Sequence, residues 1–132
     1  MLGDLILEHT GKVTSNRVLD AEKPKMENSV VTSGKAKGVD ITIIFTYWNI
    51  KCGDGLSYGE GQGVISTKNG GEVASVTEYG VGKSHGLKTM WRGSAFYRTS
   101  SNKLSFLHGI VGVFETEVDV SGNVIEKVWE WK

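Results

Sequence analysis

The sequence predicts an all-β protein: an eight-stranded antiparallel up-and-down barrel with little or no helix. Its 132 residues include 18 glycines and a single proline, and Val, Thr and aromatic residues are frequent, which is typical of strands joined by tight turns. Apolar and polar residues alternate with the period of two that strands require. Closing eight such strands leaves no edge unpaired, so we expect one barrel domain over residues 1–132.

Three strands are expected in the first part of the chain. Residues 5–18 alternate loosely and place Leu7, His9 and Val13 on one face. The charged residues 20–28 contain the only proline and are expected to form a loop, followed by a weaker strand over residues 30–37. The most apolar stretch, residues 39–51, is rich in β-branched and aromatic residues, which favours a strand over a helix. Because its apolar residues fall on both faces, we expect a homo-oligomer in which the outer side of Ile41 to Ile50 meets another subunit.

The next two strands follow a turn at Gly53-Asp54-Gly55 and meet at a hairpin. Asn69-Gly70 is the strongest hairpin signal in the chain and sets Glu60 opposite Tyr79. Alternate glycines at positions 59, 61 and 63 superficially suggest a phosphate loop, but the Lys-Ser/Thr pair and the helix of such a loop are missing. The glycines instead indicate the sharp coiling of a small barrel.

The last three strands complete the expected barrel. A two-residue loop at Ser101-Asn102 would make residues 104–120 one continuous strand, with His108 on its core-facing side beside Ala95. This histidine is the one position where the apolar pattern and the chemistry disagree, and we expect it to be mostly buried and hydrogen-bonded. A second two-residue loop, at Ser121-Gly122, would place Trp129 inside the barrel.

Charge and composition exclude several classes of function. The chain has 15 basic and 15 acidic residues and no net charge, which argues against a nucleic-acid or membrane-surface partner held by electrostatics. Cys52 is the only cysteine, so no internal disulfide or cysteine metal cluster is possible, and we expect no metal and no cofactor. The first residues lack a signal-peptide pattern, and no apolar run approaches the roughly 18 residues of a membrane span. We therefore expect a cytoplasmic protein.

Residues 55–132 carry a pattern of glycine and aromatic residues. It consists of Gly59-Glu-Gly-Gln-Gly-Val64, Arg92-Gly-Ser-Ala-Phe-Tyr97 and Leu107-His-Gly-Ile-Val-Gly-Val-Phe114. This pattern resembles the allene oxide cyclase-like, calycin-type small β-barrels, including their uncharacterised prokaryotic branch. The resemblance implies the barrel fold and a tendency to associate. Plant cyclases of the group isomerise a fatty-acid epoxide in an apolar barrel, but their catalytic residues have no counterparts that we can place in this chain.

The expected registers gather polar and aromatic side chains at one end of the interior. The candidate ligand-binding residues are Glu60, Gln62, Tyr79, Trp91, Tyr97 and His108. Convergent polar groups in an aromatic-lined barrel suit a small, largely apolar ligand. A carboxylate and an imidazole could also transfer protons. The alternative is that these groups only satisfy one another or buried water.

Three functions follow from these expectations. The first is a barrel that binds a small apolar molecule, and the second is an isomerase or cyclase that uses Glu60 or His108 as an acid or base. The third is a non-catalytic oligomeric module. Both ligand-based functions require an open interior. A cavity under about 100 Å³ would rule them out, because ligand pockets usually start at a few hundred.

Overall fold

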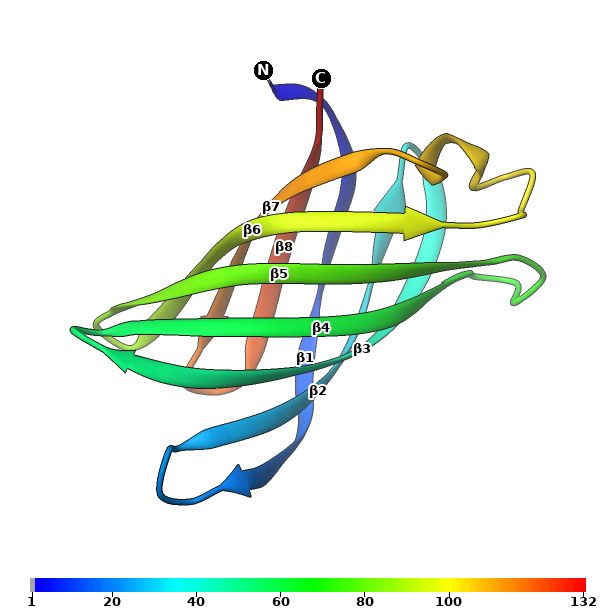
Figure 1. Ribbon diagram of the computed structural model, residues 1–132. Helices are drawn as coiled ribbons and strands as arrows, with labels where there is room; N and C mark the ends of the chain where they lie inside the picture. The colour runs from blue at the N-terminus through cyan, green and yellow to red at the C-terminus, as the bar shows by residue number, and fades with distance from the viewer. Residues whose placement is uncertain (1) are drawn as a thin grey trace.

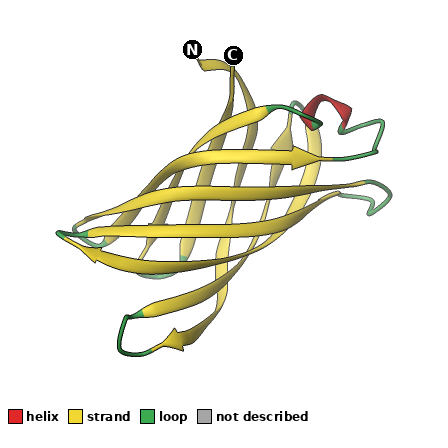
Figure 2. Cartoon of the chain, viewed as in Figure 1, coloured by secondary structure: helices red, strands yellow, loops and turns green. Residues whose placement is uncertain are grey.

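The computed structural model describes residues 2–132 and shows eight strands and one short 3₁₀ helix (Figures 1 and 2). In chain order the elements are β1 (Leu2–Asp20), β2 (Lys25–Ala36), β3 (Val39–Gly53), β4 (Leu56–Thr67), β5 (Val73–His85), β6 (Lys88–Arg98), η1 (Ser105–Leu107), β7 (Val111–Asp119) and β8 (Asn123–Trp131). Each strand pairs antiparallel with the next, and β8 pairs with β1 to close the barrel. The predicted all-β, up-and-down, eight-stranded barrel is confirmed.

Glycines on the inner face of β4 make room for aromatic rings from the neighbouring strands. A Cβ at Gly61 would lie 2.6 Å from the ring of Phe45 and from Tyr47 Cβ, and a Cβ at Gly59 would lie 3.1 Å from the ring of Trp91. The rings of Tyr47 and Trp91 meet edge to face with centroids 5.9 Å apart. The β4 glycines therefore permit a layer of aromatic side chains inside the barrel.

The connection between β6 and β7 closes one end of the barrel. Its residues Leu104 and Leu107 have no exposed surface and belong to the core. The carboxylate of Glu72, in the β4–β5 turn, accepts hydrogen bonds from Ser101 Oγ (2.6 Å) and from the backbone N–H of Lys103 (3.1 Å). The pKa of Glu72 is lowered, chiefly by the hydrogen bond from Ser101. We call residues 99–110 the plug.

The plug corrects the predicted strand over residues 104–120. The two-residue loop at Ser101-Asn102 is wrong, because the chain leaves the sheet after β6, turns through η1 and rejoins it at Val111. Ala95 therefore pairs with Gly112 instead of His108. The pairing of β6 with β7 is shifted by four residues from the prediction. Because four is an even number, the same residues of β7 face inward, and Phe114 is still in the core.

The β7–β8 turn corrects a second register. Asp119 Oδ1 accepts hydrogen bonds from the backbone N–H groups of Ser121 and Asn123, which makes this turn longer than two residues. Phe114 consequently pairs with Val128 and not with Trp129. This shift by one residue places Val124, Glu126 and Val128 inside the barrel.

An apolar surface lies on the outside of the barrel over β3 to β6. Ile44 is 60% exposed, and Val64, Tyr79 and Phe96 are also exposed. The rings of Tyr79 and Phe96 touch, with centroids 6.2 Å apart. We call these four residues the outer apolar patch. The prediction that apolar residues of β3 occupy both faces is confirmed for Ile43 inside and Ile44 outside.

Candidate functional site

The barrel interior contains a cavity of about 70 Å³. The cavity ends at fully buried residues such as Leu7 and Ile65 on the plug side, whereas Tyr47 and Val118 at its other end are partly exposed. It therefore reaches solvent at the end away from the plug. Apart from aliphatic and aromatic groups, its lining includes the polar side chains of His9, Thr32, Tyr47, Glu78, Tyr97, Thr116 and Glu126.

The volume is below the 100 Å³ that we set for ligand-based functions. As the side chains stand, a ligand that needs several hundred Å³ does not fit. A cavity of about 70 Å³ nevertheless holds roughly five water molecules. By this criterion a ligand of ordinary size is ruled out, and the cavity has room only for a group of about five non-hydrogen atoms.

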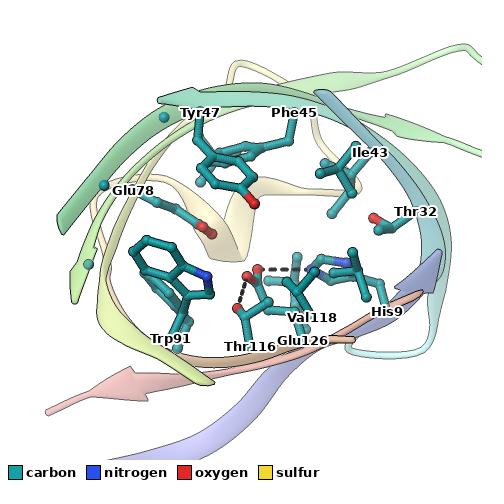
Figure 3. Close-up of a pocket in the computed structure, with 18 of the residues that line it drawn as sticks. His9, Thr32, Ile43, Phe45, Tyr47, Glu78, Trp91, Thr116, Val118 and Glu126 are labelled. Atoms are coloured by element: carbon teal, nitrogen blue, oxygen red, sulfur yellow. Dashed lines mark hydrogen bonds and ion pairs between the residues drawn. The ribbon is translucent and has the colours of Figure 1, made fainter. Parts of the chain in front are cut away.

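Three polar side chains form a network where the barrel closes. His9 on β1 and Thr116 on β7 both lie opposite Glu126 on β8. His9 Nε2 lies 3.1 Å from Glu126 Oε1, and the hydroxyl of Thr116 donates to Glu126 Oε2 (Figure 3). All three side chains are buried. Burial alone would raise the pKa of Glu126, but the hydrogen bonds and charge of its partners, led by His9, lower it. Glu126 is therefore a carboxylate at neutral pH.

Glu78 on β5 brings a second carboxyl group into the same cavity. It lies between Gly61 on β4 and Ala95 on β6, two residues too small to cover it. Burial raises the pKa of Glu78 well above its usual value, and the charge of Glu126 and a hydrogen bond with it add to this rise. Glu78 therefore keeps its proton at a pH where Glu126 has lost it.

Two buried polar atoms that face this cavity have no hydrogen-bond partner among the described residues. They are His9 Nδ1 and Thr32 Oγ1. Because Glu126 accepts from His9 Nε2, that nitrogen carries a proton, so Nδ1 is an acceptor when the ring is neutral and a donor when the ring is protonated. Buried polar groups in folded proteins are nearly always paired with protein, water or ligand. Each atom has less than 1 Å² of accessible surface, so a molecule inside the cavity would form a hydrogen bond with either of them only after a small movement of the His9 or Thr32 side chain.

Aromatic side chains complete the wall. Tyr47 and Glu78 reach into the cavity from one side, and Glu126 and Thr116 from the other, with Trp91 beside Glu78 (Figure 3). Burial raises the pKa of Tyr47 to about 12. Burial also raises the pKa of Tyr97 well above its usual value. Both phenols are therefore neutral at physiological pH and can act as hydrogen-bond donors.

Of the six predicted site residues, three border the cavity, namely Trp91, Tyr97 and Glu60, and three do not. Trp91 and Tyr97 are buried and line it. His108 is exposed in the plug, where its Nδ1 accepts a hydrogen bond from the backbone N–H of Thr99 (3.1 Å). The prediction that His108 is buried in the interior is wrong, because the plug removes it from the sheet.

The other three predicted residues lie on the opposite face of their strands. The predicted pairing of Glu60 with Tyr79 is confirmed, but the interior face of β4 carries the glycines, so Glu60, Gln62 and Tyr79 point outward. Glu60 borders the cavity only from this outward-facing position between Gly59 and Gly61. The physical reason is that Phe45, Tyr47 and Trp91 fill the space above the β4 glycines, and no further side chain fits there.

The sequence prediction missed His9, Glu78, Thr116 and Glu126 as site residues. His9 was placed on the same strand face as Leu7, which is buried, but no partner for it was recognised. Glu78 could have been found from its spacing, because it lies two residues from Val76 and from Gly80 and therefore on the same face of the strand. Both of these residues line the cavity. Glu126 was turned outward by the one-residue error in the last hairpin.

Comparisons with known proteins support the fold. No family model matches this chain, and no curated protein matches its sequence. Two solved structures superpose over nearly the whole length. A protein of unknown function from Clostridium acetobutylicum ATCC 824 has a TM-score of 0.81 at 11% identity, with 98% of each chain covered. A conserved protein of unknown function from Rhodopseudomonas palustris has a TM-score of 0.80 at 12% identity, covering 98% of this chain and 97% of the other. At such identities the likeness shows the fold alone.

Two further searches of residues 2–132 gave negative results. No group of three or more His, Cys, Asp and Glu side chains in this range is arranged to hold a metal ion. No helix within the same residues has the length and apolarity to cross a membrane.

Proposed function

We propose that the protein binds a small molecule, or a small end group of one, inside the barrel. The observation that carries this proposal is the pair of unpartnered buried atoms, His9 Nδ1 and Thr32 Oγ1, on the wall of a cavity open at one end. Apolar and aromatic groups make up most of that wall, and a few polar groups converge in it, as in most small-molecule sites. The size of the cavity narrows the predicted apolar ligand to about five non-hydrogen atoms.

Replacing Thr32 by valine tests this proposal. The change removes the unpartnered hydroxyl and leaves the shape of the side chain nearly unchanged. Methyl resonances of Val30 and Ile43, which line the cavity, should shift when 1-butanol or butylamine is titrated into the wild-type protein. Thr32→Val should weaken this binding, whereas Thr42→Val, outside the barrel, should not. If neither compound shifts these resonances, the cavity is not a binding site.

A second candidate function is acid–base catalysis, such as an isomerisation through an enol. It is favoured by one observation, the presence in one cavity of two buried carboxyl groups whose pKa values are shifted in opposite directions, Glu78 upward by burial and Glu126 downward by its hydrogen bonds. Glu126 would take a proton from the carbon next to a carbonyl while Glu78 gives its proton to the carbonyl oxygen. Glu126 would then return its proton to another carbon as Glu78 recovers its own. Solvent deuterium should enter butanone in the presence of the wild-type protein and not of Glu126→Gln. Equal incorporation with both proteins would refute this function.

This catalytic proposal replaces the one based on Glu60 and His108, because Glu60 only borders the cavity from an outward-facing position and His108 is exposed in the plug. Membership of the allene oxide cyclase-like group, association of subunits and a cytoplasmic location all stay predictions from the sequence. The small-barrel architecture supports the predicted membership of the allene oxide cyclase-like group.

A further inference from the structure

The charges that line the cavity are unbalanced. Two carboxyl groups, Glu78 and Glu126, face it, and His9 is the only basic side chain among the described residues that line it. His9 is already engaged by Glu126. No Lys or Arg in the lining is available to hold an anionic ligand, so a carboxylate or phosphate would meet the carboxylate of Glu126 without a free cationic side chain to bind it.

Several polar atoms of the wall can accept hydrogen bonds, beside the donors that the phenols of Tyr47 and Tyr97 supply. The carboxylate of Glu126, the carbonyl oxygen of Glu78, the hydroxyl of Thr32 and His9 Nδ1 can all accept, and the last two have no partner. A ligand that fits them must carry several donors on a small centre. An alkylammonium group has three N–H donors on one nitrogen.

The aromatic layer favours the same kind of ligand. Tyr47 and Trp91 flank Glu78 in the view of Figure 3, and their rings meet edge to face. Aromatic faces attract cations within about 6 Å, more strongly where water is excluded. Acidic groups beside aromatic rings thus provide a pocket for an organic cation.

We infer that the ligand is a short primary amine in its protonated form, bound with its nitrogen near Glu78 and Glu126 and its alkyl chain against the aromatic layer. This inference rests on the proposed function and specifies the ligand class for the same site. It excludes fatty acids and other carboxylates as ligands.

Binding should depend on pH through Glu78. An ammonium group favours ionised Glu78, which is protonated in the empty protein. The other titratable groups that face Glu78 are Tyr47, Tyr97, Glu126 and His9, from β3, β6, β8 and β1. The two tyrosines stay neutral and Glu126 stays ionised in the range tested. Affinity for the amine should therefore rise with pH, by up to about tenfold per pH unit for as long as Glu78 stays protonated in the empty protein, because binding releases the proton of Glu78.

Three probes of five non-hydrogen atoms each test the inference: butylamine, 1-butanol and propionate. Titrations followed by the methyl resonances of Val30 and Ile43 should give the tightest binding for butylamine, weaker binding for 1-butanol and none for propionate. Glu78→Gln should weaken butylamine binding by at least about tenfold and remove its pH dependence. The exposed Glu115→Gln on β7 is the matched control and should behave like the wild type.

The outcomes separate this inference from the proposed function. If 1-butanol or propionate binds at least as tightly as butylamine, the ligand class is wrong while binding in the cavity stands. If butylamine binds equally well to Glu78→Gln and to the wild type, the inference is also refuted. If none of the three probes shifts the cavity resonances, the proposed function itself fails.

Discussion

The substitution Glu78→Gln should make the protein more stable at neutral pH. Glutamine has nearly the shape of a protonated glutamic acid and is neutral in both the folded and the unfolded chain. Glu78, in contrast, is protonated in the buried site but titrates near 4.5 when the chain unfolds. Its raised pKa in the folded state means that the wild-type protein must gain a proton to fold at any pH between 4.5 and that raised pKa.

The sign and size of the effect follow from this proton. The stability associated with Glu78 is fully present below pH 4.5 and is lost as the pH rises toward the folded pKa. For each pH unit above 4.5 over which Glu78 stays protonated, the free energy of unfolding falls by about 1 kcal/mol relative to Glu78→Gln. Glu126 has the opposite sign, because its lowered pKa stabilises the fold above the unfolded value and loses that effect toward acid.

Urea unfolding followed by tryptophan fluorescence at pH 5, 6, 7 and 8 measures the difference. The difference in the free energy of unfolding between Glu78→Gln and the wild type should grow by about 1 kcal/mol for each pH unit until Glu78 ionises in the folded protein. Glu115→Gln should follow the wild type. Parallel pH profiles for the wild type and Glu78→Gln would refute the reasoning, since they would mean that Glu78 is ionised in the folded state.

Three more predictions concern the barrel. Gly61→Ala should lower the free energy of unfolding by about 1–3 kcal/mol in urea titrations, because its Cβ would lie 2.6 Å from Phe45, whereas Gly71→Ala in an open turn should change it little. Leu107→Ala should lower the free energy of unfolding by about 2–5 kcal/mol, because Leu107 is fully buried. Leu87→Ala is the control, because Leu87 is 73% exposed. Equal losses in the two variants would contradict the buried position of the plug. Ile44→Lys should abolish self-association, measured by light scattering at high protein concentration. Val73→Lys, which changes another exposed apolar residue, should leave self-association unchanged. A monomeric wild-type protein would refute assembly through the outer apolar patch.

The alternation of residues was enough to predict the barrel, but not the interior. Hairpin signals with glycine in the left-handed region, such as Gly70 with φ of 74°, fixed the β4–β5 register correctly. The plug could not be predicted from the same rules. Phe106, His108 and Ile110 continue the period of two into β7, so the pattern alone cannot distinguish a strand from a covering loop whose leucines are buried by tertiary contacts.

Predicting the site depended on which face of each strand turned inward. On β4 the polar residues seemed the better candidates, since glycine has no side chain to bury. The structure shows the reverse, because the rings of Phe45 and Trp91 come from other strands and need the empty space over the glycines. Such complementarity between distant residues is invisible to a pattern read along one strand. Glu126 was not predicted as a site residue for a different reason. The Asp119 side chain accepts hydrogen bonds in the last turn and makes that turn longer than predicted, so Glu126 faces inward and not outward.

The network of His9, Glu126 and Thr116 has a consequence for how the protein is made. His9 and Glu126 are 117 residues apart in the chain, and their strands are the first and last of the barrel. During synthesis the site cannot exist until β8 has left the ribosome and paired with β1. A ligand that needs this network therefore binds only the finished, closed barrel and stabilises it over every partly assembled form. Occupancy of the cavity would thus report that folding is complete.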